Sequence, residues 1–202
     1  MQHSFLALGD SYTIGEQVRI DQSFPYQTVQ LLRKARLPFY APEIIATNGW
    51  RTDELNLAID ETILQPAYDF VSLLIGANNQ YQDKSAEEFR VHFKVLLEKA
   101  IQLTGGQANH VIVLSIPDWG VTPFAVDKPT EKIRSEIELY NFICQAEAEY
   151  FQTHFIDITT SQRQDGNKGE FLAQDQLHPS GKEYFKWAQQ LSAVIQSVLT
   201  KS

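Results

Sequence analysis

The chain has 202 residues, of which 43% are hydrophobic and 21% charged, a composition typical of a globular enzyme and too apolar for a disordered chain. Seventeen Lys and Arg against 25 Asp and Glu give a net charge of −8, which argues against nucleic acid or an anionic membrane as the main partner, because both are bound through basic patches. Cys144 is the only cysteine, so an intramolecular disulfide and every multi-cysteine metal site are excluded.

The sequence contains neither a long apolar segment nor a recognisable targeting signal. No run of 18 apolar residues occurs, so no membrane insertion is expected. Residues 1–8 have no cationic start and no small-residue cleavage site, so the chain as given is expected to be cytoplasmic, although a signal peptide already removed would leave no trace. No repeat or linker divides the chain, and we expect one domain over residues 1–202, of unknown oligomeric state.

Short apolar runs alternate with longer helical patterns along the chain. Strands are predicted at residues 4–8, 43–47, 69–75, 110–115 and 154–158. Helices are predicted at about residues 25–36, 52–64, 85–103, 131–150 and 180–199. Ser85 with Glu88 forms a capping box, and Gly105-Gly106 can end the third helix. This alternation predicts a three-layer α/β/α domain with about five parallel strands.

Two long connections without a helical pattern follow predicted strands, at residues 117–130 and 159–179. Both should emerge at the carboxyl edge of the parallel sheet, where ligands bind in open α/β folds. Long loops in a compact domain usually carry function. We therefore expect the functional site at this edge.

A serine lies directly after the first predicted strand, in the run Gly9-Asp10-Ser11. The glycine allows a sharp turn of the backbone, which places the serine at the carboxyl edge of the sheet. A serine hydroxyl becomes a nucleophile beside a base, usually a histidine that a third group orients. Alone, the run is also compatible with an ordinary turn stabilised by local hydrogen bonds.

Of the five histidines, His178 has the surroundings that a catalytic base needs. It lies at the end of the second long loop, three residues after Asp175 and just before the last predicted helix. One turn of chain lets the carboxylate accept a hydrogen bond from one ring nitrogen and leaves the other nitrogen facing a substrate. The same spacing also fits a helix cap followed by a solvated histidine.

Two further strand ends combine a glycine with an amide side chain. The second strand runs into Asn48-Gly49, and the third runs into Gly76 and, two residues later, Asn78. A glycine permits close approach of the backbone, and an amide can donate hydrogen bonds to an oxyanion. Asn and Gly are also common turn formers, so neither motif is specific by itself.

The order and placement of these four motifs resemble the SGNH hydrolase superfamily, also called the GDSL lipase/esterase family. The resemblance extends from Gly9 to His178, almost the whole chain, and four motifs in order are more specific than any one of them. It implies a flavodoxin-like three-layer sandwich and acyl transfer through a serine. The family includes lysophospholipases, thioesterases and carbohydrate acetylesterases.

The resemblance implies a role for each matching residue. Ser11 would be the nucleophile, His178 the base and Asp175 the acid that orients the base. The backbone N–H groups of Ser11 and Gly49, together with the side-chain amide of Asn78, would form the oxyanion hole.

The sequence departs from the family pattern at two places. Asn79 stands where the family often has Asp, and Gln176-Leu177 replace a glycine that often lies between the acid and the histidine. Neither departure removes a catalytic group. Two other carboxylates, Asp10 beside the serine and Asp157 at the end of the fifth strand, are interpreted as structural.

The expected substrate is a small ester. No insertion is long enough to form a separate lid. Four aromatic residues after the strand ends or in residues 117–130 are candidates for the walls of a small apolar pocket: Trp50, Tyr81, Trp119 and Phe124. We therefore expect a serine esterase of short-chain carboxylic esters that uses no cofactor and no metal.

Two alternatives stay open on the sequence alone. Asp10, Asn78, Asp175 and His178 have suitable side chains for a metal-dependent phosphoesterase, although only one histidine falls at a sheet-edge loop. A non-catalytic binding module on the same fold would usually have lost the serine or the histidine. A nucleotide site is excluded, because residues 9–15 fit neither the dinucleotide nor the P-loop spacing.

Overall fold

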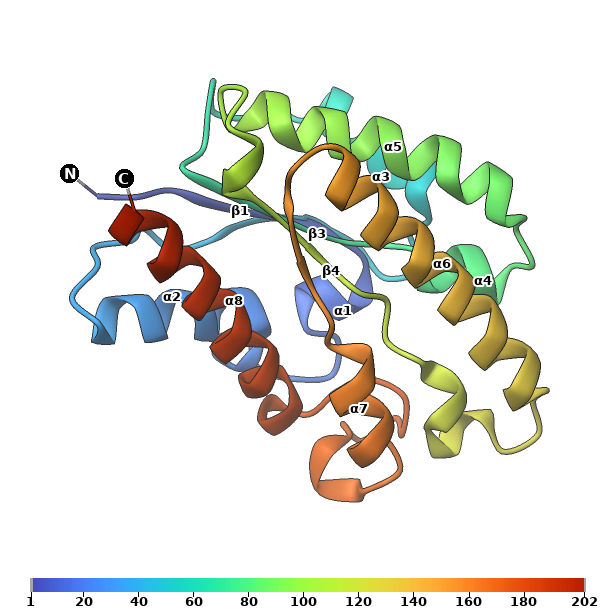
Figure 1. Cartoon of the computed structure of the whole chain (residues 1–202). Coiled ribbons are helices and arrows are strands. Elements are labelled where there is room, and N and C mark those ends of the chain that lie inside the picture. The colour runs from blue at the N-terminus through green and yellow to red at the C-terminus, as the bar shows by residue number, and fades with distance from the viewer. Residues whose placement is uncertain (1, 202) are drawn as a thin grey trace.

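Five parallel strands form the centre of the molecule in the computed structural model, which describes residues 2–201 (Figure 1). The strands are β1 (Phe5–Gly9), β2 (Glu43–Ala46), β3 (Phe70–Leu74), β4 (Val111–Leu114) and β5 (His154–Ile156). Their order in the sheet is β2-β1-β3-β4-β5, which is the order of flavodoxin-like folds. The predicted α/β class with about five parallel strands is confirmed.

The register of the strands brings three strand ends to the same level. Gly9 at the end of β1 pairs with Ala46 of β2 on one side and with Leu74 of β3 on the other. The chain runs outward in opposite directions from β1 and β3, and folds of this kind bind ligands at the carboxyl end of that switch point. The residues that follow these three strands therefore meet at one place.

Helices cover both faces of the sheet. They are α1 (Ser11–Ile14), α2 (Phe24–Lys34), α3 (Thr52–Glu61), α4 (Ala77–Tyr81), α5 (Ala86–Leu103), α6 (Thr130–Tyr150), α7 (Thr159–Asp165) and α8 (Gly181–Lys201). Figure 1 shows α2 and α8 on one face and α3, α5 and α6 on the other. Every residue of β1, β3 and β4 is buried, as expected for a parallel sheet covered on both faces.

The long helices bury one apolar face each. In α8, Trp187, Leu191 and Ile195 follow one another at four-residue spacing and are fully buried, because this spacing repeats on one side of a helix. Cys144 of α6 is also fully buried, and burial raises the pKa of its thiol well above the usual value. These residues belong to the same hydrophobic cluster as the strands.

The helix boundaries follow the predicted signals closely. Ser85 caps α5, since its hydroxyl accepts a hydrogen bond from the Glu88 N–H at 3.1 Å. The same helix ends before two glycines of positive φ, and the Gly106 N–H donates to the Ile101 carbonyl at 2.9 Å. None of the helices within residues 2–201 is long and apolar enough to cross a membrane.

The prediction of a loop over residues 159–179 is wrong for its first third, where α7 forms. The run Thr-Thr-Ser-Gln-Arg-Gln-Asp has no apolar periodicity, so no pattern in the sequence indicates a helix. Side-chain hydrogen bonds to the segment after β4 hold α7 in place instead. The short helices α1 and α4 were missed for a related reason, because four or five residues are too few to show a period.

Candidate active site

Ser11 is the first residue of α1 and directly follows the turn that ends β1. A side chain at Gly9 would collide with this turn, because an added Cβ would lie 2.1 Å from the Thr13 hydroxyl and 2.4 Å from the Leu74 carbonyl oxygen. Asp10 caps the helix, with its Oδ1 accepting from the Tyr12 N–H at 3.0 Å. The turn therefore presents the Ser11 hydroxyl at the carboxyl edge of the sheet.

The structure brings Ser11, His178 and Asp175 into one hydrogen-bonded chain. Ser11 Oγ lies 2.9 Å from His178 Nε2, and His178 Nδ1 lies 2.6 Å from Asp175 Oδ2. When Nδ1 carries the proton that Asp175 accepts, Nε2 is free to accept from the serine hydroxyl. His178 is buried, with an exposed fraction of 6%, and its ring packs 5.1 Å from that of Tyr12.

Asp175 is held as a charged acceptor by the turn that contains it. Its Oδ1 accepts from the backbone N–H groups of Leu177 and His178, both at 3.0 Å. Burial by itself would raise the pKa of Asp175, but these bonds and the one from the His178 ring outweigh it, so the pKa lies below its usual value. Gln176 has a φ of 60°, a left-handed conformation that favours glycine.

Two of the three residues predicted to form the oxyanion hole, Ser11 and Asn78, line one cavity with His178, and Gly49 directly follows Asn48 of the same cavity. The backbone N–H groups of Ser11 and Gly49 make no hydrogen bond to another group of residues 2–201. Gly49 has a φ of 85°, a conformation that favours glycine. The Asn78 amide donates to the Trp50 carbonyl at 3.0 Å, which joins α4 to the loop of Gly49 and leaves its second N–H unassigned.

A cavity of about 180 Å³ opens beside Ser11 and His178. Three of the four predicted aromatic residues line it: Tyr81, Trp119 and Phe124. Trp119 packs edge-on against the other two, with ring centroids 5.3 Å and 6.2 Å away, and it is only 5% exposed. The cavity therefore has one aromatic wall next to Ser11 and His178.

Trp50, the fourth predicted aromatic residue, is not among the residues that line this cavity. Its side chain packs against the hydrophobic core instead, and only its carbonyl reaches the site through Asn78. Four further residues line the cavity without having been predicted as pocket walls: Tyr12, Asn48, Ala77 and Leu177. All four are chain neighbours of a motif residue, and this adjacency is the signal that could have found them.

A larger open groove of about 800 Å³ lies between Val18 and Phe185 and contains neither Ser11 nor His178. Within residues 2–201, no three His, Cys, Asp or Glu side chains lie close enough together to hold a metal ion.

The model of the GDSL-like lipase/acylhydrolase family matches residues 7–184. The chain belongs to the GDSL-like lipase/acylhydrolase family. As a family member it is a carboxylic ester hydrolase, and its substrates are small-molecule esters. No curated protein matches its sequence.

Solved structures of other hydrolases share the fold of this GDSL-like hydrolase. A psychrotrophic esterase, EstA from Pseudoalteromonas sp., is 14% identical, with a TM-score of 0.74 over 98% of this chain and 100% of the other. An acetyl xylan esterase variant from Geobacillus stearothermophilus is 18% identical, with a TM-score of 0.75 over 96% and 94% of the two chains. A lipase/acylhydrolase from Enterococcus faecalis is 19% identical, with a TM-score of 0.70 over 96% and 93%.

Proposed function

We propose that this hydrolase is a serine esterase that cleaves short-chain carboxylic esters through an acyl-enzyme on Ser11. The observation that carries the proposal is the unbroken chain of hydrogen-bond contacts from Ser11 Oγ to His178 and on to Asp175, at the edge of the cavity. Such a chain activates a serine hydroxyl, because the histidine can take its proton and the carboxylate stabilises the resulting imidazolium.

The proposed reaction has two acyl-transfer steps. In the first, His178 Nε2 takes the Ser11 proton as Oγ attacks the ester carbonyl, and the protonated ring then gives the proton to the leaving alcohol. In the second, His178 takes a proton from water as the water attacks the acyl-enzyme, and the protonated ring returns that proton to Ser11 Oγ as the carboxylic acid leaves. Asp175 holds the ring in the required orientation throughout.

The negative oxygen of each tetrahedral intermediate needs donors that are already in position. The backbone N–H groups of Ser11 and Gly49 and the Asn78 side chain are proposed for this role. Support comes from the two backbone donors, which have no partner within residues 2–201, and from the bond that holds Asn78 beside the Gly49 loop. Fixed donors of this kind stabilise the transition state more than the substrate.

The size of the cavity supports a preference for short acyl chains. Its volume of about 180 Å³ is below the roughly 300–1,000 Å³ of typical ligand pockets. Trp119 closes one side of it and is itself buried. An acyl group from acetyl to about hexanoyl fits this space better than a longer chain.

The test combines an activity-based probe with a series of p-nitrophenyl esters. A fluorophosphonate should label Ser11, as read by mass spectrometry of the adduct, and Ser11→Ala should lose labelling and at least about 10³-fold in kcat. Ser135→Ala, on an exposed stretch of α6, serves as the control and should keep both. Labelling at another serine, or full activity in Ser11→Ala, would overturn the proposal, and inhibition by chelators would favour the metal-dependent alternative.

A further inference from the structure

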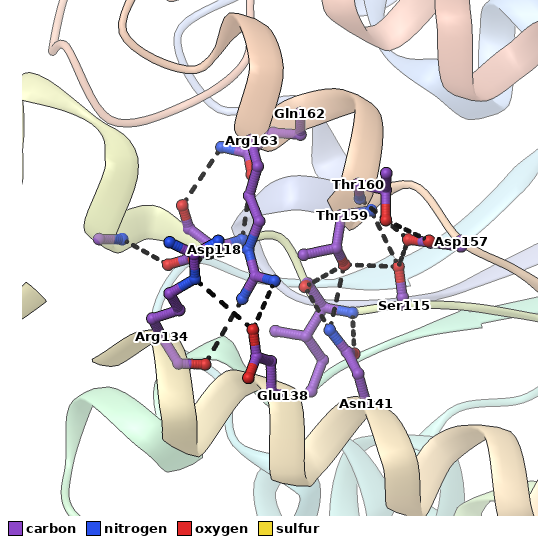
Figure 2. A network of polar contacts seen from close by, with 12 residues as sticks. Ser115, Asp118, Arg134, Glu138, Asn141, Asp157, Thr159, Thr160, Gln162 and Arg163 are labelled. Atoms are coloured by element: carbon purple, nitrogen blue, oxygen red, sulfur yellow. Dashed lines mark hydrogen bonds and ion pairs between the residues drawn. The ribbon is translucent and has the colours of Figure 1, made fainter. Parts of the chain in front are cut away.

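The segment that leaves β4 carries Trp119 to the cavity, and side chains from two helices hold its first residues (Figure 2). The Ser115 hydroxyl accepts from the backbone N–H groups of Ile158 and Thr159 at 2.9 Å and 3.1 Å. The Asn141 amide of α6 accepts from the Ile116 N–H at 2.6 Å and donates to the Ile116 carbonyl at 3.0 Å. The backbone is thereby fixed before it reaches the cavity.

Helix α7 then holds Asp118, the residue immediately before Trp119. Gln162 bonds both backbone groups of Asp118, accepting from its N–H at 3.1 Å and donating to its carbonyl at 3.3 Å. Arg163 Nε donates to Asp118 Oδ2 at 2.8 Å, and Asp118 Oδ1 accepts from the Gly120 N–H at 3.0 Å. Every polar group of this buried aspartate therefore has a partner.

Arg163 connects this segment to α6 with its other nitrogens. Its Nη1 donates to Glu138 Oε1 at 2.9 Å, and Nη2 lies 3.5 Å from the Arg134 carbonyl (Figure 2). The Asp118 side chain is 1% exposed and that of Arg163 is 19% exposed, whereas Arg134 and Glu138 are more than half exposed. The pair with Asp118 is thus the one that solvent screens least.

Helix α7 packs so closely against the segment that carries Trp119 that neither has much space to move. A Cβ added to Gly166, just after α7, would lie 2.6 Å from Val121 and 2.8 Å from the Gln162 carbonyl oxygen. Trp119 begins the short 3-10 helix η3 (Trp119–Val121), whose turn is capped by Asp118. A shift of Asp118 would therefore be transmitted to the indole that lines the cavity.

We propose that Arg163 is a positioning residue that sets the acyl-chain preference of the enzyme by holding Asp118, and through it Trp119, at the cavity wall. Arg163 does not line the cavity, so its effect on substrates passes through Trp119. The inference rests on the proposed esterase function, because it assigns the Trp119 wall to the acyl group. It predicts that loosening this contact enlarges the pocket, as truncation of Trp119 itself would.

The experiment compares kcat/KM for p-nitrophenyl acetate and octanoate in variants of the full chain. Arg163→Gln alone would leave Asp118 buried without its ion-pair partner, so Asp118→Asn/Arg163→Gln is the main variant. Its asparagine can still accept from the Gly120 N–H and carries no charge. We expect the octanoate-to-acetate ratio to rise by at least about threefold, with kcat/KM for acetate changed less than about twofold, a modest effect of pocket shape.

Three matched variants separate positioning from general damage. Arg134→Gln removes a cation that also pairs with Glu138 but does not touch Asp118, and its ratio should equal that of wild type. Arg163→Lys keeps one charge for Asp118 and should give an intermediate ratio. In a Trp119→Ala background, the Asp118→Asn/Arg163→Gln change should have no further effect on the ratio, because the wall on which it acts is gone.

The outcomes distinguish the two proposals. Three results would each overturn the role of Arg163. The folded Asp118→Asn/Arg163→Gln variant could keep the wild-type octanoate-to-acetate ratio, or it could lose activity equally on both esters. The ratio could also change by the same factor when Trp119 is absent. If thermal melting shows that this variant is unfolded, Arg163→Lys provides the test instead. An intermediate octanoate-to-acetate ratio in Arg163→Lys supports the role of Arg163, and a wild-type ratio overturns it. Failure of the proposed function looks different, since wild type would then hydrolyse neither ester or would be labelled away from Ser11.

Discussion

Asp10 lies next to the proposed nucleophile, yet its contacts are those of a structural residue. It is fully buried, one carboxylate oxygen accepts from the Tyr12 N–H, and Oδ2 has no hydrogen-bond partner within residues 2–201. Burial raises the pKa of Asp10 to about 7, and the bond from the Tyr12 N–H offsets only part of this rise. The group is therefore a helix cap that takes up a proton at higher pH than an exposed aspartate does.

The raised pKa of Asp10 makes stability depend on pH in a definite direction. Between pH 4 and 7 the Asp10 carboxyl of the folded chain keeps a proton that it has lost in the unfolded chain, so the contribution of Asp10 to the free energy of unfolding should fall as pH rises through this interval. Asp10→Asn cannot ionise and still offers an oxygen to the Tyr12 N–H. We expect its stability relative to wild type to increase by roughly 2–3 kcal/mol from pH 5 to pH 8.

Urea unfolding of wild type and Asp10→Asn at both pH values measures this difference. Asp127→Asn, which changes an exposed aspartate, is the control and should show the same difference from wild type at pH 5 and pH 8. If the stability difference between Asp10→Asn and wild type were the same at pH 5 and pH 8, folding would not change the pKa of Asp10.

At the scale of elements, α4 places two neighbouring asparagines in different environments. Asn78 lines the cavity and donates to the Trp50 carbonyl, whereas Asn79 is 1% exposed and faces α3. Asn79 Oδ1 accepts from the Thr52 N–H at 3.0 Å, and its Nδ2 donates to the Thr52 hydroxyl at 2.8 Å. The same short helix thus supplies one group to the site and one that joins it to α3.

These two environments predict that alanine at Asn78 mainly affects catalysis and that alanine at Asn79 mainly affects stability. Asn78→Ala should lower kcat about 10²–10³-fold with a smaller change in KM, because a donor to the oxyanion acts on the transition state. Asn79→Ala should be much milder in kcat but should lower the free energy of unfolding by about 1–3 kcal/mol, since Thr52 loses its buried partner. Steady-state kinetics give kcat and KM for both variants, and urea unfolding gives their stability. If Asn79→Ala lowered kcat and Asn78→Ala did not, the oxyanion role would belong to Asn79.

At the scale of the whole molecule, the site is assembled from segments that lie far apart in the sequence. Ser11 and His178 are separated by 167 positions, and the cavity between them also takes walls from α4, from η3 and from η4 (Pro123–Ala125). The backbone of Phe124 in η4 donates to the Gln176 carbonyl at 3.2 Å, which links one cavity wall to the turn of Asp175. Pocket shape is therefore a property of the entire fold.

The chain-length preference tests this property. Wild type should cleave p-nitrophenyl esters from acetyl to about hexanoyl faster than longer ones, because the cavity is small. Trp119→Ala should move the optimum toward longer chains by opening one wall, as measured by kcat/KM across the ester series. Tyr40→Ala, which truncates an exposed aromatic residue outside the cavity, is the control. A wild-type optimum at decanoyl or beyond contradicts the small pocket, and an unchanged profile in Trp119→Ala removes that residue from the wall.

The sequence by itself determined the features that depend on local patterns. Apolar runs and helical periods predicted the five strands and the five long helices, and Ser85 and the glycines after α5 predicted its ends. The motifs after β1 and before α8 also pointed to Ser11 and His178, since each lies at a strand or helix end that a parallel sheet brings to one edge.

Only the tertiary structure decided what depends on contacts between distant residues. Trp50 follows a motif and Trp119 follows a strand, yet only Trp119 lines the cavity, whereas Trp50 is partly buried against the hydrophobic core. Packing, and not position in the chain, directs each side chain. Helix α7 has no hydrophobic period. It is held in position by hydrogen bonds between Asp118 and the side chains of Gln162 and Arg163, more than 40 residues away. Such bonds require the fold to bring both segments together, so no local pattern in the sequence predicts them.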